Sequence, residues 1–290
     1  MYSKDEIELE LQKLNDFGFL MENETISDIR NNLHSSEIWA DVFWRRRENH
    51  SKRFDPEIQF IFDNNPKTIL EIGTAYGRVL NKIAVENEKQ TKKANLFGIE
   101  ICKHCKKYFQ AYSKKHPLLE KCNILFDDFL KGSNVHQKQF DVIVLSMNTF
   151  PSFPFSMLEN LFSAVRKHLN PNGSWIFSTY KPKATDNKYN AKNLRKNYSG
   201  ELLIELVKDI IAGEHYQFPA IKKDYGMQAI TYSSYNRLTR DYKLKERQIY
   251  RNTREFINPD NLKKIINNND FSIEFIDTSS HSAVYYLSMT

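Results

Sequence analysis

The chain has 290 residues, with 42 Lys and Arg against 36 Asp and Glu, and a formal net charge of +6. Hydrophobic residues make up 40% of it and charged residues 27%, which argues against extended disorder. No apolar run reaches the roughly 20 residues that a membrane span needs, and the acidic, amphipathic start is not a secretory signal. Three cysteines predict reduced thiols and a cytoplasmic protein.

The first fifty-odd residues predict a helical arm. Apolar residues recur at helical spacing in three stretches, at residues 4–17, 27–34 and 36–48. A further helix is expected to begin at Pro56, because proline suits a first helical position, with Asp55 as its N-cap. We assign residues 1–54 to an N-terminal helical arm packed against the main domain.

The middle of the chain alternates short apolar runs with amphipathic helices. The runs that we interpret as buried strands lie at residues 69–72, 95–100, 122–126, 140–145 and 174–180. This alternation is typical of the α/β class and predicts a doubly wound, mostly parallel sheet. After a helix that begins at Pro259, with Asn258 as its N-cap, two more runs at 271–277 and 283–289 predict a terminal antiparallel hairpin. The expected sheet therefore has seven strands.

Residues 182–253 interrupt the alternation. A polar stretch leads into a helix predicted over 201–212, and two strand-like runs follow at 228–236 and 242–250. We interpret 182–253 as an α+β cap inserted into a main domain of residues 55–181 and 254–290. Aromatic residues of this cap suit a substrate lining and a small sheet core equally well, among them Tyr225, Tyr232 and Tyr235.

The first strand ends in a turn of small residues that leads into a helix. The free N–H groups at a helix start favour an anionic or polar ligand, and small residues let that ligand approach the backbone. A dinucleotide fingerprint needs glycine where Arg78 stands, and the phosphate-binding G-x-x-x-x-G-K-[ST] motif is absent.

Glu71 to Arg78 read E-x-G-x-[GA]-x-G-R, which resembles the first motif of class I S-adenosylmethionine-dependent methyltransferases. The resemblance covers about residues 66–181 and 254–290 and implies a Rossmann-like methyltransferase fold. It also implies S-adenosylmethionine as cofactor and S-adenosylhomocysteine as product. Five residues of the motif would then bind the cofactor, namely Glu71, Gly73, Thr74, Ala75 and Gly77. Ala75 departs from the family, which has glycine there.

Acidic residues follow the next two strands, as the same family would have them. Glu100 ends the second strand, where the resemblance implies a carboxylate that accepts two hydrogen bonds from the ribose hydroxyls. After the third strand, Asp128, with Asp127 as the alternative, would accept from the adenine amino group, and Phe129 would pack on the ring. The resemblance adds two further cofactor contacts, Ile101 and Ser146.

The fourth strand runs into a loop, Ser146–Phe150, that resembles the N-[ST]-F loop of small-molecule N-methyltransferases. This implies that Asn148 and Phe150 line the acceptor site. Tyr180 ends the fifth strand, where it suits packing as well as substrate contact. The catalytic residues are not identified by the sequence. If a general base exists, His215 and Tyr180 are the candidates, but an amine that binds unprotonated needs none.

Cys102 and Cys105 lie three residues apart and raise the alternative of a zinc site. No second pair of ligands accompanies them apart from His104 and His116, and Cys105 shares its helix face with aromatic residues. We therefore expect buried thiols and no metal.

Three functions fit these observations. The first is an enzyme that transfers a methyl group to nitrogen or oxygen of a small molecule by in-line displacement. The second has RNA as the acceptor, which the basic composition permits, although the basic clusters are spread along the chain and nucleic-acid faces concentrate their charge. The third is a non-catalytic methyltransferase-like binding module, against which the largely intact cofactor motifs argue. The oligomeric state does not follow from the sequence.

Overall fold

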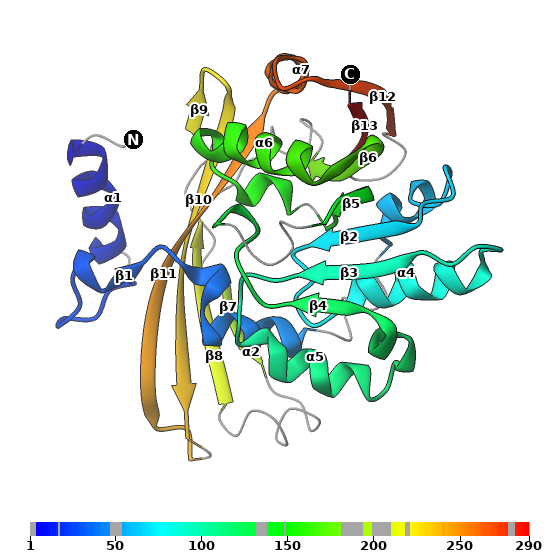
Figure 1. Cartoon of the computed structure of the whole chain (residues 1–290). Coiled ribbons are helices and arrows are strands. Elements are labelled where there is room, and N and C mark those ends of the chain that lie inside the picture. Colours follow the sequence, from blue (N-terminus) through cyan, green and yellow to red (C-terminus); the bar gives the residue numbers. More distant parts are fainter. Residues whose placement is uncertain are drawn as a thin grey trace. The chain divides into compact units, whose positions relative to one another are not determined.

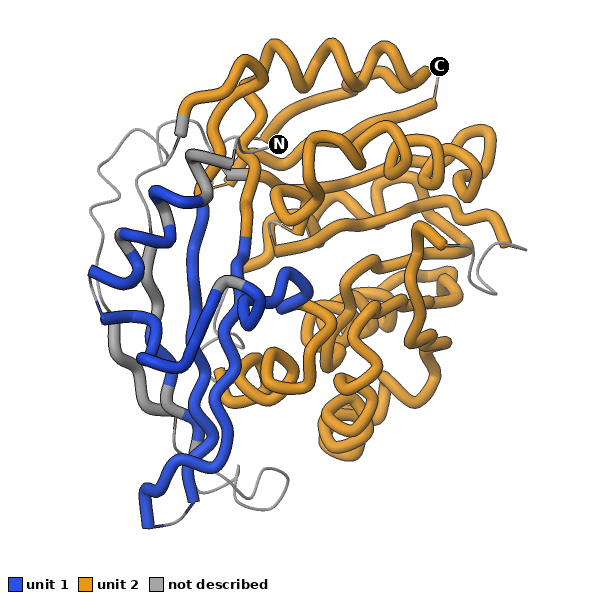
Figure 2. The backbone as a smooth tube through the Cα atoms, turned by 90° about the vertical axis from the view of Figure 1, so that its left-hand side faces the viewer, with its two compact units in different colours: residues 1–33, 189–219, 230–252 blue, residues 34–188, 220–229, 253–290 orange. Residues whose placement is uncertain are grey.

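The structure is a computed structural model of the whole chain. It describes residues 4–16, 18–46, 54–131, 138–147, 149–180, 194–198, 210–217, 221–239, 241–277 and 282–289. These residues fall into two compact units (Figure 2): unit 1 comprises residues 1–33, 189–219 and 230–252, and unit 2 comprises residues 34–188, 220–229 and 253–290. In the part of the chain described, no helix is long and apolar enough to cross a membrane.

Unit 2 is built on a seven-stranded sheet with the order β12-β13-β6-β5-β2-β3-β4 (Figure 1). Its strands are β2 (Thr68–Ile72), β3 (Asn95–Ile99), β4 (Asn123–Leu125), β5 (Phe140–Leu145), β6 (Leu169–Tyr180), β12 (Phe271–Asp277) and β13 (Ser282–Met289). Strands β2 to β6 pair in parallel, whereas β13 is antiparallel to β6 and β12 is antiparallel to β13. The predicted α/β, doubly wound and mostly parallel fold is confirmed.

The helices of unit 2 alternate with these strands, except that η2, α2 and η3 precede β2. The α-helices are α2 (Glu37–Arg45), α4 (Arg78–Lys89), α5 (Cys105–Ser113), α6 (Leu158–His168) and α7 (Pro259–Asn268). The short 3-10 helices are η2 (Leu33–Ser35), η3 (Pro56–Phe60), η4 (Pro117–Lys121), η5 (Phe129–Lys131), η7 (Phe150–Ser152) and η8 (Phe155–Met157). The segment η2 begins one residue before the unit 2 boundary.

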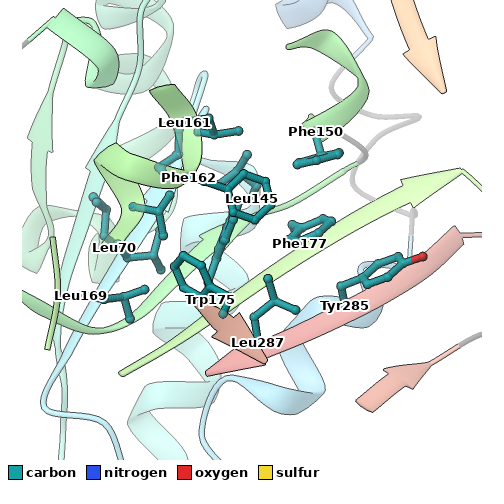
Figure 3. Close-up of a cluster of buried hydrophobic side chains, with 14 of the residues drawn as sticks. Leu70, Leu145, Phe150, Leu161, Phe162, Leu169, Trp175, Phe177, Tyr285 and Leu287 are labelled. Carbon is teal, nitrogen blue, oxygen red and sulfur yellow. The ribbon is translucent and has the colours of Figure 1, made fainter. Parts of the chain in front are cut away.

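Two hydrophobic cores lie on the two faces of this sheet. On one face, α6 and α7 pack on Trp175 and Phe177 of β6 and on Tyr285 of β13, as Figure 3 shows for part of the cluster. On the other face, α4 and η3 pack on residues such as Ile69 and Val144. Because successive side chains of a strand point to opposite faces, Ile69 and Glu71 lie on the α4 side and Leu70 on the α6 side.

Two predicted caps had different outcomes. Asn258 caps α7 as expected, since its Oδ1 accepts a hydrogen bond from the Asn261 N–H at 2.8 Å. Asp55 occupies the N-cap position of η3, as predicted, but its side chain makes no cap hydrogen bond. The Asp55 carboxylate binds Arg78 instead, at 2.6 Å from both terminal guanidinium nitrogens. A buried charge is stabilised far more by a guanidinium than by one N–H group.

Unit 1 contains most of a second sheet, of order β1-β11-β10-β8-β7, with β9 on β10. The elements of unit 1 and of this sheet are α1 (Lys4–Asp16), η1 (Ile26–Asp28), β1 (Ile29–Arg30), β7 (Leu194–Tyr198), β8 (Ile210–Gln217), β9 (Ile221–Lys223), β10 (Gly226–Leu238) and β11 (Leu244–Ile257). β9 and parts of β10 and β11 belong to unit 2. Tyr232 and Tyr235 are buried, and Tyr235 packs edge-on against Tyr250, as the sheet-core alternative predicts.

Two predicted helices are wrong. Residues 27–34 form two short 3-10 turns and the strand β1, which pairs in parallel with Ile249–Tyr250. Ile210–Ala212, the end of the helix predicted over 201–212, lie in β8 and pair with residues 236–238 of β10. The rest of that predicted helix lies outside the described residues. The two strand-like runs of the insertion are confirmed and are longer than predicted.

Candidate functional site

The turn between β2 and α4 has a left-handed backbone at three positions. The φ angles are +82° at Gly73, +51° at Ala75 and +93° at Gly77. Gly77 could not be replaced without strain, because a Cβ atom there would lie 2.8 Å from the Phe109 ring. Glycine adopts this backbone readily at positions 73 and 77, whereas Ala75 adopts it at a cost.

Hydrogen bonds fix this turn to the carboxyl end of β3. The N–H groups of Gly73 and Thr74 both donate to the Ile99 carbonyl, at 2.9 and 3.2 Å. The Thr74 hydroxyl donates to the Glu71 carbonyl at 3.2 Å, which closes the turn over its own strand. Gly98 in β3 leaves room for this, since a Cβ atom there would lie 2.5 Å from Thr74 Oγ1.

Glu100 lies against the turn. Its Oε2 accepts from the Ala75 N–H at 2.7 Å, and its Oε1 accepts from the Cys102 N–H at 2.8 Å. Burial raises the pKa of this carboxyl, and the two N–H donors oppose that shift. A carboxylate has about four acceptor positions, so these two bonds leave capacity for a vicinal diol. The structure thus brings Glu100 and Ala75 together, 25 residues apart in sequence.

Replacing Ala75 by glycine is expected to raise the free energy of unfolding slightly, by about 0.5 kcal/mol. Relief of the left-handed alanine is worth roughly 1–2 kcal/mol, and the greater entropy of the unfolded glycine removes about 0.5–1 kcal/mol. Urea denaturation of the two proteins measures the difference. A loss of more than about 1 kcal/mol in Ala75→Gly would contradict the left-handed conformation at this position.

Glu71 and Ser146 face each other at the carboxyl ends of β2 and β5. The Ser146 hydroxyl donates to Glu71 Oε1 at 2.9 Å, and Glu71 is only 1% exposed. Glu71 Oε2 is buried and has no hydrogen-bond partner among the described residues. Burial raises the pKa of Glu71 to about 8, against the opposing effects of Ser146 and Arg78. A carboxylate in such a place is suited to a cationic ligand or to a bound proton.

An ion pair that the sequence did not predict lies beside the turn. Arg78, the first residue of α4, makes its bidentate contact with Asp55, and Lys82 Nζ lies 2.7 Å from Asp55 Oδ2. The Arg78 and Asp55 side chains are 3% and 1% exposed. Burial alone would raise the pKa of Asp55, but the bonds and charges of Arg78 and Lys82 lower it. No local pattern reveals this pair, because its members lie 23 residues apart.

Helix α2 covers the same turn. Phe43 and Trp44 both pack on the Tyr76 ring, with centroids 5.4 and 5.5 Å away. Trp44 is buried and also stacks on Tyr108 at 5.3 Å, and the Tyr108 hydroxyl donates to Asp41 of α2. Helix α2 therefore closes one side of the turn by packing.

The remaining predicted cofactor residues lie close to the strand ends. Ile101 follows Glu100 and is 48% exposed. Asp128 is partly buried, and its Oδ1 accepts from the Leu130 N–H at 3.0 Å, while its alternative Asp127 is exposed. Phe129 lies in the core and packs against His168.

The predicted acceptor residues are only partly described. Asn148 lies outside the described residues, as do the side chains of Tyr180 and His215, whose strands are β6 and β8. His215 belongs to unit 1. Phe150 is buried and stacks on Phe177 with centroids 4.4 Å apart (Figure 3), which is a core position.

The two neighbouring cysteines are buried, as expected of core thiols. Cys102 and Cys105 are free, and the Cys102 thiol donates to the Ser36 carbonyl at 3.4 Å. Within the described ranges, no three His, Cys, Asp or Glu side chains are grouped as a metal ion would require.

A curated protein is similar to part of this chain in sequence. A curated relative, a polyamine aminopropyltransferase from Clostridium tetani (strain Massachusetts / E88), is 27% identical over 125 residues. That match spans 41% of this chain and 42% of the relative's length, so the chain matches less than half of that protein.

Solved structures share the fold over most of their length. An S-adenosylmethionine-dependent methyltransferase from Clostridium acetobutylicum ATCC 824 is 14% identical, with 95% of this chain and 98% of that chain covered and a TM-score of 0.54. CalS10, an amino pentose methyltransferase from Micromonospora echinaspora solved with S-adenosylmethionine bound, is 8% identical, with coverages of 88% and 92% and a TM-score of 0.51. At these identities the matches show the shared fold.

A family model described as a methyltransferase domain matches residues 43–274, which include the turn, Glu100 and the strands of the seven-stranded sheet up to β12. The match covers more than half of the chain and agrees with the motif between Glu71 and Arg78. The chain therefore belongs to the methyltransferase domain family.

Proposed function

We propose that this protein is an S-adenosylmethionine-dependent methyltransferase. The observation that carries the proposal is the contact between Glu100 and the turn, where the Ala75 N–H holds the carboxylate at 2.7 Å. The two lie at the carboxyl ends of β2 and β3, next to the β5–β2 boundary at which the strand order reverses. In open α/β sheets, ligands bind at such a switch point.

Each cofactor contact has a proposed role. The backbone from Gly73 to Gly77 passes close to the bound cofactor, and Glu100 accepts hydrogen bonds from the two ribose hydroxyls. Asp128 retains acceptor capacity beside its bond to Leu130 and receives the adenine amino group. Ile101 supplies exposed apolar surface beside the adenosine. Glu71, through its unpartnered Oε2, favours the positive charge that this cofactor carries.

Methyl transfer from this cofactor does not require the protein to form a covalent bond to the substrate. S-adenosylmethionine supplies a methyl group that is already electrophilic, so the chain's own residues must align the acceptor in line with it. The loop from Ser146 to Thr149 follows β5 at the switch point and is where we place the acceptor. Helix α2, packed on Tyr76, helps to exclude water from the turn. The proposal needs no general base if the acceptor is an unprotonated amine.

We propose a small molecule as the acceptor, with methylation at nitrogen or oxygen and amines first. Among proteins of this fold, one acts on an amino pentose, and the curated relative is named for polyamines. Buried carboxylates close to the switch point, Glu57 and Glu71, suit a cationic or amine ligand better than a polyanion. RNA, which carries a negative charge at every phosphate, is therefore the less suited acceptor.

A transfer assay tests the acceptor class. Protein and S-adenosylmethionine with a labelled methyl group are incubated with polyamines, amino sugars and total RNA in separate reactions. We expect label on at least one amine and none on RNA, with S-adenosylhomocysteine as the second product. Label on RNA with every amine unlabelled would overturn the acceptor class and leave the cofactor assignment intact.

Glu100→Ala is expected to weaken S-adenosylmethionine binding by about 100-fold. Loss of two hydrogen bonds to a charged acceptor accounts for roughly 3 kcal/mol, which corresponds to that factor. Isothermal titration calorimetry measures both dissociation constants, with Glu120→Ala, at an exposed carboxylate, as the matched control. Equal affinity in the wild type and in Glu100→Ala would remove Glu100 from the site.

A further inference from the structure

The short helix η3 carries two buried carboxylates, Asp55 at its N-cap position and Glu57 in its first turn. Neither belongs to the motif between Glu71 and Arg78. Glu57 is 1% exposed and lies 14 residues before Glu71 in the sequence. Burying two acidic side chains in one turn of chain is costly unless each has specific partners. Those partners lie on two different loops of the proposed site.

Asp55 holds the cofactor turn. Its two carboxylate oxygens bind Arg78, the residue that follows the left-handed Gly77 and begins α4. A bidentate guanidinium contact fixes direction as well as distance. The end of the turn is thereby tied to η3 at 2.6 Å.

Glu57 holds the loop after β5. Its Oε1 accepts from the Met147 N–H at 3.1 Å, and Ser178 of β6 also hydrogen-bonds to its side chain. Met147 has a left-handed backbone with φ of +57°, which is unfavourable for a side chain of this kind. The residue before it, Ser146, is held by Glu71. Two consecutive residues of this loop are therefore held by buried carboxylates from η3 and β2.

We infer that Asp55 and Glu57 act together as positioning residues for methyl transfer, because η3 fixes the loop after β5 against the cofactor turn. We name this arrangement the η3 bridge, made of Asp55 and Glu57 with their contacts to Arg78 and Met147. The role of the η3 bridge in catalysis rests on the proposed function, because we assign the turn after β2 to the cofactor and the loop after β5 to the acceptor. The structural coupling itself does not depend on that assignment.

The bridge makes a prediction that separate, local contacts would not make. Asp55 bonds to Arg78 and the Met147 N–H bonds to Glu57, yet releasing η3 from Arg78 must loosen Glu57 and, through it, the Met147 N–H. Amide hydrogen exchange reports such local opening residue by residue. We expect Asp55→Ala and Glu57→Ala each to speed exchange at the Met147 amide by about tenfold or more.

Conservative variants separate positioning from charge. Glu57→Gln keeps a side-chain oxygen for the Met147 N–H. The exchange rate of the Met147 amide in this variant is therefore expected to stay within about threefold of the wild type. The matched control is Asp141→Ala, which removes a carboxylate that accepts from the Lys67 and Thr68 N–H groups at the opposite end of β2. It should leave the exchange of Met147, relative to β5 amides such as that of Val144, unchanged.

The test is hydrogen exchange followed by NMR on the full chain without ligand, with urea denaturation of each variant to subtract global destabilisation. Unchanged exchange at Met147 in Asp55→Ala would overturn the bridge, even if Glu57→Ala behaved as expected. If Asp55→Ala does not fold, Asp55→Asn and Arg78→Lys weaken the same contact and carry the same expectation.

S-adenosylmethionine titration of the same proteins distinguishes the two proposals. Failure of the wild type to bind S-adenosylmethionine contradicts the proposed function, not the η3 bridge.

In an acceptor assay, the positioning role also has a kinetic signature. Glu57→Ala should lower kcat by about 10-fold or more and change the dissociation constant of S-adenosylmethionine by less than about threefold, while Glu57→Gln restores most of kcat. A fall in cofactor affinity with unchanged kcat would contradict a role in placing the acceptor loop.

Discussion

Arg78→Ala is expected to lower the free energy of unfolding by about 3 kcal/mol. Removing one partner of a buried ion pair typically costs about 3–5 kcal/mol, because the other charge stays buried without compensation. Asp55 keeps Lys82 at 2.7 Å, so the lower end of that range applies. Urea denaturation at neutral pH measures the loss, with the slope m compared to establish that both proteins unfold alike.

The matched control for Arg78 is Lys82→Met. Lys82 contacts the same carboxylate, but its side chain is 31% exposed, and such partners contribute less than about 1 kcal/mol. We expect a clear difference between the two variants in the free energy of unfolding. Equal losses, or a loss below about 1 kcal/mol in Arg78→Ala, would mean that Asp55 does not depend on the guanidinium.

Glu71→Gln is expected to stabilise the protein without ligand, and by more as the pH rises. Burial raises the pKa of Glu71 from 4.5 to about 8, so the folded state binds a proton that the unfolded state releases. The stabilisation of the folded state by this proton is fully present below about pH 4.5 and is lost as the pH rises through 8. A pKa shift of this size lowers the free energy of unfolding by roughly 3–5 kcal/mol between pH 5 and 9, as an upper estimate.

Glutamine is the appropriate substitution because it resembles the protonated carboxyl. Its Oε1 can accept the bond from the Ser146 hydroxyl, and it places no charge in the buried site. Urea denaturation of both proteins from pH 5 to pH 9 gives the difference in unfolding free energy at each pH, in which other titrating groups cancel. A difference that does not change with pH would show that Glu71 is charged throughout.

The central sheet could be predicted because its signals are local. The β5 strand has the predicted bounds Phe140–Leu145, since a short apolar run between polar residues is typical of a buried parallel strand. The turn could be predicted for the same reason, as Gly73, Ala75 and Gly77 are small where the backbone is left-handed. Asn258 is a cap whose partner lies only three residues away.

Errors arose where the decisive partner is distant in sequence. The apolar residues Ile210 and Ile211 fit a helical spacing, yet they pair with Leu238 and Arg237 of β10. Ile29 likewise pairs with Ile249 across 220 residues. Strand formation depends on such neighbours more than on intrinsic preference.

The candidate site follows the same rule. The family motif identified Glu71 and Glu100, whose positions relative to the strands are fixed by the fold. Asp55 was interpreted as a cap and Arg78 only as a departure from glycine, because nothing within either segment indicates that the two meet. Glu57 was missed entirely, since a glutamate in a first helical turn is usually a solvated residue stabilised by the helix dipole.

A crystal structure of the protein with S-adenosylhomocysteine tests the central claim most directly. We predict that the ligand lies at the carboxyl ends of β2 and β3, with both ribose hydroxyls within hydrogen-bond distance of Glu100 and the homocysteine part over the Gly73–Gly77 turn. The Ala75 N–H should remain bonded to Glu100. A ligand bound elsewhere on the chain, with the Glu100 carboxylate unchanged and the turn empty, would contradict the account.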